Sequence, residues 1–155
     1  MCKIVIADSS CLIGLSKIKR LNLLYELFEE ILIPKAVFQE VVLQGENRKG
    51  CIDVKNANWI KTQSVKNDLA VSILSKTLGF GESEAMVLTT EKSADFLILD
   101  DGKARKIAKE MDLPIIGTIG ILMIAEKKKL IQSAKAELLE LNKIGFRCNI
   151  NLLNK

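Results

Sequence analysis

The stretch Lys3–Asp8 reads K-I-V-I-A-D, a short apolar run rich in β-branched residues that ends on an aspartate. A continuous apolar run of this length is typical of a strand covered on both faces of a sheet, because neither set of alternate side chains is polar. Ser9 and Ser10 follow Asp8, and all three are residue types that favour helix starts. The stretch therefore predicts an interior strand, a turn at Asp8 and a helix beginning near Cys11.

The same order of strand and helix repeats along the chain. Further strands are predicted at Ile31–Ile33, Asp95–Leu99 and Pro114–Ile116, with an edge strand at Trp59–Val65 and a last strand at Cys148–Leu152. Helices are predicted at Cys11–Lys17, Leu21–Phe28, Lys35–Leu43, Asp68–Thr77, Glu82–Lys92, Lys103–Met111, Thr118–Lys128 and Ala134–Ile144, and a loop at Gln44–Gly50. This alternation predicts an α/β fold with a mainly parallel sheet, formed by residues 1–155 as one domain.

The composition restricts the chemistry that the chain can carry out. It contains no histidine, which excludes Ser-His-Asp and Cys-His catalysis and histidine-ligated zinc. The four cysteines are scattered without metal-ligand spacing, as expected of buried thiols in a reducing cytoplasm. No apolar stretch has the length of a membrane span, and the net charge of +4 permits contact with nucleic acid without requiring it.

Acidic residues follow two of the predicted interior strands. Asp8 follows the first strand, and Asp100 and Asp101 follow the strand that ends at Leu99. In an open parallel sheet, ligands bind beyond the carboxyl ends of the strands. Each acid taken alone is also explained as a helix cap or a turn residue. Independent caps, however, have no reason to gather at one edge of a sheet.

Two further acids occur within apolar helical segments. Glu40 lies in the helix after Pro34, and Glu82 follows the break Gly79-Phe80-Gly81. Solvent exposure or a favourable interaction with a helix dipole would also account for them. Carboxylates that are crowded together require a cation, and an oxygen-only ligand set favours Mg²⁺ or Mn²⁺. Such a site is suited to phosphodiester hydrolysis.

Five segments together resemble the successive motifs of PIN-like domains, in particular the branch of predicted nucleic-acid-binding proteins. The resemblance runs from Lys3 to about Phe146, and its motifs are specific only as a set. They are V-I-A-D-S-S at Val5–Ser10, I-P-x-x-V-x-x-E-V at Ile33–Val41, L-G-x-G-E-x-E-A at Leu78–Ala85, L-I-L-D-D-x-x-A-R at Leu97–Arg105 and G-T-x-G-I-L at Gly117–Leu122.

The resemblance implies a three-layer, Rossmann-like α/β/α sandwich whose acids bind Mg²⁺ or Mn²⁺ and cleave RNA. Many relatives are ribonuclease toxins of toxin–antitoxin pairs, so a cognate antitoxin and a homodimer are the implied protein partners. Asp8 then matches the first acid of the family and Glu40 the second. Glu82 matches the third, and Asp100 or Asp101 the fourth.

The chain departs from the family pattern at the third acid, which is an aspartate in typical PIN nucleases. Glu82 and Glu84 lie about 200° apart around a helix, so only one of them can face the site. Glu82 is favoured because Ala85, Met86 and Thr89 share its face, and Glu84 is the alternative. The fourth position is doubled in the same way, as Asp100 and Asp101.

Contacts to the substrate are predicted from the residues around these acids. Lys103 and Arg105 follow the fourth acid and would attract the phosphate backbone of RNA without reading its bases. A solvated helix face explains Lys103 and Arg105 equally well. Ser9 and Thr118 are candidates to orient a ligand or water, although helix capping accounts for both.

Two other classes of protein compete with a metal-dependent ribonuclease. The first is a PIN-like module that binds nucleic acid or protein and has lost catalysis, which the glutamate at the third acid supports. The second is another phosphoryl-transfer α/β domain, such as a haloacid-dehalogenase-like or receiver-like fold. It is disfavoured because Asp8 is followed by Ser9-Ser10, without a second aspartate two residues on.

Overall fold

Strand β1 lies at the centre of a five-stranded sheet in the computed structural model, which describes residues 3–43 and 49–146. The strands are β1 (Val5–Ala7), β2 (Ile31–Pro34), β3 (Ile60–Gln63), β4 (Phe96–Ile98) and β5 (Ile115–Ile116). They follow the order β3-β2-β1-β4-β5, and all four pairings are parallel. The predicted parallel sheet is thus confirmed, with β1 and β4 side by side at its centre.

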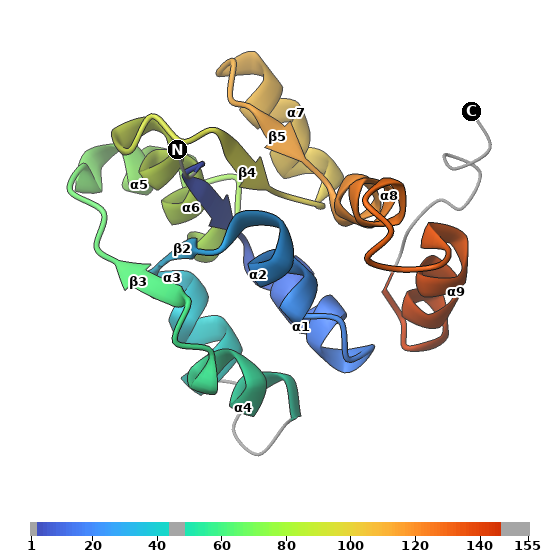
Figure 1. The fold of residues 1–155 in the computed structure, drawn as a ribbon. Coiled ribbons are helices and arrows are strands. Elements are labelled where there is room, and N and C mark those ends of the chain that lie inside the picture. The colour runs from blue at the N-terminus through green and yellow to red at the C-terminus, as the bar shows by residue number, and fades with distance from the viewer. Residues whose placement is uncertain (1–2, 44–48, 147–155) are drawn as a thin grey trace.

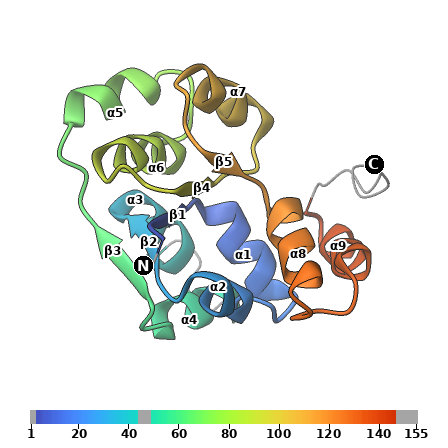
Figure 2. The ribbon, with the colours of Figure 1, turned by 45° about the horizontal axis from the view of Figure 1, so that its top comes forward.

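Helices cover both faces of the sheet (Figures 1 and 2). One face carries α1 (Ser9–Lys17), α2 (Asn22–Phe28), α4 (Lys49–Asn56), α8 (Thr118–Lys127) and α9 (Ala134–Lys143). The other carries α5 (Asp68–Leu74), α6 (Phe80–Glu91) and α7 (Gly102–Glu110). After β2 the chain forms α3 (Lys35–Phe38) and then a π-helical turn, η1 (Gln39–Leu43). The predicted three-layer α/β/α architecture is therefore confirmed.

The side chains of β1 alternate between two hydrophobic cores. Val5 and Ala7 pack with α1, α2, α8 and α9, whereas Ile6 packs with α6 and α7. All three are fully buried, which explains why this strand reads as a continuous apolar run. The prediction of a third buried strand at Pro114–Ile116 was wrong in one respect. Ile115 and Ile116 form the edge strand β5 and are only half-buried, because a single neighbouring strand covers them.

Several predicted helix limits differ from those in the structure. The helix predicted to start at Glu82 begins at Phe80, with Gly79 as its N-cap residue. Helix α5 ends at Leu74, before the predicted limit at Thr77, and two of its apolar residues are largely exposed, Leu69 at 71% and Ile73 at 59%. Helix α4 starts at Lys49, within the predicted Gln44–Gly50 loop, and was not predicted. The strand predicted at Cys148–Leu152 lies outside the described residues.

The last helix ends at a glycine. Gly145, which has a φ of +93°, follows shortly after α9 ends and suits the left-handed backbone there. Within the described part of the chain, no helix is long and apolar enough to cross a membrane.

Removal of the side chain of Asn67 should destabilise the protein more than removal of that of Asp68. Helix α5 begins at Asp68, as predicted, but its cap is the residue before it, because the Asn67 Oδ1 accepts the hydrogen bond from the Ala70 N–H at 3.1 Å. Loss of such a cap lowers the free energy of unfolding by about 1 kcal/mol. Urea denaturation of Asn67→Ala and Asp68→Ala measures the difference, and a larger loss in Asp68→Ala would contradict the assignment of the cap.

Candidate active site at the carboxyl edge of the sheet

Asp8 directly follows the central strand β1 and is almost completely buried, with 3% of its surface exposed. Its backbone N–H continues the sheet by donating to the Ile98 carbonyl of β4 at 3.1 Å. Asp8 occupies the N-cap position of α1, but its side chain makes no capping hydrogen bond. Among the described residues, its Oδ1 has no hydrogen-bond partner. Helix capping therefore does not explain why a carboxylate is buried here.

The environment of Asp8 disfavours its charged form. Burial raises the pKa of this carboxyl from its ordinary value of 3.8 to about 7, against the opposing effect of the Ser9 backbone N–H. The negative charges of Glu82, Glu40 and Asp100 raise the pKa of Asp8 further. Asp8 thus lies within electrostatic range of three other acids from three separate segments.

Glu40 and Glu82 meet at the N-terminus of α6. The Glu40 Oε1 accepts a hydrogen bond from the Gly81 N–H at 3.1 Å, and the Glu82 Oε1 accepts one from the Gly79 N–H at 3.2 Å. A Cβ at Gly81 would overlap the Glu40 carboxylate, so the glycine allows this close approach. Burial, together with the charges of Asp101 and Glu40, raises the pKa of Glu82. The start of α6 therefore holds two acids beside Asp8.

Glu84, the alternative to Glu82, has a different set of contacts. Its Oε1 accepts a hydrogen bond from the Ala36 N–H at 2.9 Å, which ties α6 to the first turn of α3. The structure thus gives Glu84 a role in packing two helices together, whereas Glu82 interacts with Asp8 and Asp101.

Asp100 and Asp101 also differ from each other. Both oxygens of Asp100 are bonded to Thr118, Oδ1 to its N–H at 2.7 Å and Oδ2 to its hydroxyl at 2.6 Å. Burial raises the pKa of Asp100, although the Thr118 hydrogen bonds and the charge of Arg105 act to lower it. Asp101 is exposed and caps α7, its Oδ2 accepting from the Ala104 N–H at 3.0 Å. Asp101 lies within electrostatic range of Glu82, whereas Asp100 is bonded to the start of α8.

The predicted substrate-binding residues surround these acids at different depths. Arg105 is half-buried, and its Nη1 donates to the Leu99 carbonyl at 2.7 Å, beside Asp100. Lys103 is exposed in the first turn of α7, and Ser9 is half-buried in the first turn of α1. Thr118 is fully buried and contacts Asp100. Of the two predicted cations, Lys103 is therefore the one that is exposed to solvent.

Some residues that shape the site were missed at the level of sequence. Gly79 and Gly81 were read only as a helix break, yet their N–H groups bind Glu82 and Glu40. Gly117 was given no role beyond its place in the motif G-T-x-G-I-L, yet a Cβ there would lie 3.0 Å from the Arg105 Nη1 and 3.2 Å from the Asp100 Oδ1. The Gly-x-Gly spacing before an acid was the available signal for close backbone approach.

The donor set fits a hard divalent cation. All the acids offer oxygen, and the buried, unpartnered Oδ1 of Asp8 would gain a partner from a bound ion. Within residues 3–43 and 49–146, no three acidic or thiol side chains lie close enough together to hold an ion. Glu40, Glu82, Asp100 and Asp101 each accept a hydrogen bond from a backbone N–H. The residue types therefore fit such an ion, although their side chains are not close enough together to coordinate it in this structure.

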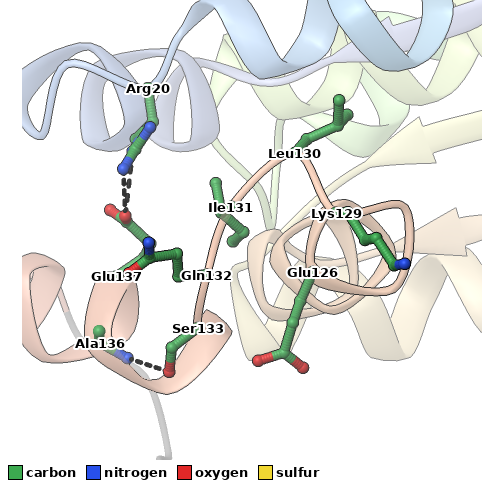
Figure 3. Close-up of a pocket in the computed structure, with 9 residues that line it drawn as sticks. All are labelled: Arg20, Glu126, Lys129, Leu130, Ile131, Gln132, Ser133, Ala136 and Glu137. Atoms are coloured by element: carbon green, nitrogen blue, oxygen red, sulfur yellow. Dashed lines mark hydrogen bonds and ion pairs between the residues drawn. The ribbon is translucent and has the colours of Figure 1, made fainter.

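Two cavities on the described surface lie away from these acids. The larger, of about 620 Å³, lies between Arg20, in the turn after α1, and the segment from Glu126 of α8 to Glu137 of α9, with Arg20 and Glu137 paired at 2.8 Å (Figure 3). The smaller, of about 450 Å³, includes Lys3, Phe28 and Phe96 at the amino edge of the sheet. No acid of the candidate site lines either cavity.

Replacement of Thr118 by valine should destabilise the protein by about 1–3 kcal/mol. Valine has nearly the same shape but removes the hydroxyl that donates to Asp100, leaving one oxygen of a partly buried carboxylate without that partner. Chemical denaturation at pH 8 measures the loss, and Thr118→Ser, which keeps the hydroxyl, is the matched control. Equal stability of the valine variant and the wild type would contradict a structural role for this bond.

The fold and the site together define a class of protein. A parallel α/β sheet carries acids from four segments at the carboxyl ends of its two central strands, as in α/β proteins that bind ligands at this edge. A family model described as PIN domain matches residues 4–155, so the chain belongs to the PIN-domain family and has a nuclease-type fold. No curated protein matches the chain.

Proposed function

We propose that this PIN domain is a metal-dependent ribonuclease whose site is centred on Asp8. PIN domains are generally nucleases and typically use divalent metals. The observation that carries the proposal is the buried Asp8 carboxylate, which has an unpartnered oxygen, a pKa raised to about 7 and three acids nearby. An uncompensated buried charge is costly in a purely structural role. The burial of the Asp8 carboxylate is explained if its native partner is a cation.

In this proposal Asp8, Glu40, Glu82 and Asp101 hold Mg²⁺ or Mn²⁺. A divalent ion at such a site activates water and neutralises charge that develops on the phosphodiester. Asp100, bonded through both oxygens to Thr118, fixes the start of α8 beside the site and adds negative charge to it. Its role is to position the neighbouring groups and not to bind the ion directly.

Basic and hydroxyl groups supply the contacts to RNA. Lys103 and Arg105 attract the phosphate backbone, with the exposed Lys103 reaching it first and Arg105 fixed against Leu99. Ser9 is placed at the start of α1 to orient water or substrate near Asp8. A cytoplasmic toxin role, a cognate antitoxin and a homodimer are further parts of the proposal that rest on the family resemblance alone.

A second function is a PIN domain that binds nucleic acid or protein without cleaving it. Two observations favour this alternative. The third acid is a glutamate in place of the usual aspartate, and in the described part of the chain no three acids are gathered closely enough for an ion. Both would follow if the metal site had lost its function.

Cleavage of synthetic RNA by the purified chain separates the two functions. Single-stranded and structured RNA are incubated with the wild type and with Asp8→Ala, in Mn²⁺, in Mg²⁺ and in EDTA. We expect cleavage by the wild type in either metal and none in EDTA or by Asp8→Ala. Cleavage that persists in EDTA would contradict the proposal. RNA binding without cleavage in any metal would establish the binding module instead.

A further inference from the structure

Helix α6 and the segment formed by α3 and η1 are joined by two hydrogen bonds that run in opposite directions. The Glu84 Oε1 of α6 accepts the Ala36 N–H of α3 at 2.9 Å. The Glu40 Oε1 of η1 accepts the Gly81 N–H of α6 at 3.1 Å. On each segment the two bonded residues are three or four positions apart, which is about one helical turn. The two segments are therefore bonded to each other at both ends of this turn.

Neither helix start has a capping side chain of its own. The N-cap residue of α3 is Pro34 and that of α6 is Gly79, and neither residue type has a side-chain acceptor. The N–H groups in the first turn of a helix have no partner within the helix, so they need acceptors from elsewhere. Glu84 supplies one to α3, and Glu40 supplies one to α6. Each segment thus depends on a glutamate of the other for part of its cap.

The two glutamates differ in their relation to the acidic site. Glu40 is one of the acids that act electrostatically on Asp8, whereas Glu84 is bonded to α3. Because η1 follows α3 directly, a shift of α3 also moves Glu40. The bond between Glu40 and Gly81 alone would let the segment turn about one point of contact. The bond of Glu84, one turn away, removes this freedom.

We propose that Glu84 is a positioning residue, whose bond to α3 holds Glu40 at the start of α6 and thereby sets the affinity of the site for a divalent cation. The inference rests on the proposed ribonuclease function and adds a residue outside the acids that would bind the ion. Partners that orient metal ligands commonly change metal affinity or activity by about ten- to a hundredfold. The role requires an acceptor for the Ala36 N–H, so glutamine at position 84 should also fulfil it.

Glu91, on the same helix, provides the matched control. Its carboxylate accepts the Lys66 and Asn67 N–H groups at 2.8 to 3.0 Å and so holds the start of α5. Helix α5 carries none of the acids of the candidate site. Glu91→Ala therefore removes a carboxylate that binds a neighbouring helix start, as Glu84→Ala does, but it does not act on the segment that carries Glu40.

Amide hydrogen exchange, measured by NMR in EDTA, reports the position of Glu40 without metal or turnover. The reporter is the N–H of Gly81, which is a buried residue bonded to Glu40. We expect this N–H to exchange about tenfold faster in Glu84→Ala and at the wild-type rate in Glu84→Gln and Glu91→Ala. Unchanged exchange at Gly81 in Glu84→Ala would overturn the inference, as would an equal rise in Glu91→Ala.

Calorimetric titration of Mn²⁺ measures the consequence for the site. Glu84→Ala should bind the ion at least about tenfold more weakly, with Glu84→Gln and Glu91→Ala close to the wild type. Gly81→Ala is a second variant that displaces the same acid directly, because its Cβ would overlap the Glu40 carboxylate, and it should weaken binding to a similar extent. Wild-type affinity in Glu84→Ala, or a loss that glutamine does not restore, would contradict the positioning role.

The two measurements separate this inference from the function on which it rests. If the wild type binds no Mn²⁺ and cleaves no RNA, yet Gly81 exchanges faster only in Glu84→Ala, the ribonuclease proposal fails and the positioning of Glu40 by Glu84 is retained. If the wild type binds the ion and cleaves RNA, and Glu84→Ala matches it in exchange and in affinity, the positioning role is wrong and the ribonuclease proposal stands.

Discussion

Asp8→Asn is expected to raise the free energy of unfolding of the metal-free protein at pH 8 by up to about 4 kcal/mol. Burial raises the pKa of Asp8 from 3.8 to about 7 in the folded protein. The unfolded chain releases this proton near its ordinary pKa, so the favourable contribution of Asp8 is complete only below that value. It is lost as the pH rises to about 7, and asparagine, which is neutral, avoids the loss.

Urea denaturation of both proteins in EDTA at pH 4, 6 and 8 tests this expectation. The stability difference should be small at pH 4, grow through pH 6 and level off above pH 7. Asp112→Asn, at an exposed aspartate, is the matched control and should change little at any pH. A difference that does not vary with pH, or an Asp8→Asn protein that is less stable at pH 8, would contradict the described environment of Asp8. The gain in stability with loss of function would be typical of an active-site residue.

Glu82→Gln is expected to reduce RNA cleavage by at least about ten- to a hundredfold, whereas Glu84→Gln should leave it close to the wild-type level. Glutamine still offers an Oε1, so Gly79 keeps its partner in the first variant and Ala36 keeps its partner in the second. Each substitution thus removes one negative charge and preserves the hydrogen bond seen in the structure. Of these two glutamates, only Glu82 adds its negative charge to the group of acids around Asp8 in the proposed site.

Single-turnover cleavage in Mn²⁺ measures the two rates, and circular dichroism verifies that both variants are folded. A loss confined to Glu84→Gln would reverse the assignment of the third acid. Equal losses in both variants would show that charge near the N-terminus of α6, and not a particular carboxylate, supports activity.

The sequence was sufficient to predict the central part of the fold. The runs at Val5–Ala7 and Leu97–Leu99 are buried on both faces. Because burial on both faces requires apolar side chains at every position, such strands can be recognised from residue type alone. Acids directly after such strands must lie at the carboxyl edge of a parallel sheet, so the neighbourhood of Asp8 and Asp100 was predictable. The edge strand β5 has the same apolar composition with less burial, and composition alone does not separate the two cases.

The choice within each doubled acid depends on contacts between distant segments. Glu84 is distinguished from Glu82 by the Ala36 N–H, 48 residues away in the chain. Asp100 is distinguished from Asp101 by both donors of Thr118, 18 residues away. Local spacing places each pair at the site but carries no information about these partners. The same reasoning explains the helix cap at Asn67, where two adjacent residues are both good caps and backbone geometry selects one.

Calorimetric titration of Mn²⁺ into the wild type and into Asp8→Asn, at pH 6 and at pH 8, measures whether Asp8 is the centre of a metal site. We expect the wild type to bind the ion and to release close to one proton on binding at pH 6 but little at pH 8, because the pKa of Asp8 is about 7. Asp8→Asn should bind at least about tenfold more weakly. Absence of Mn²⁺ binding by the wild type, or equal affinity in the two proteins, would contradict a metal site centred on Asp8.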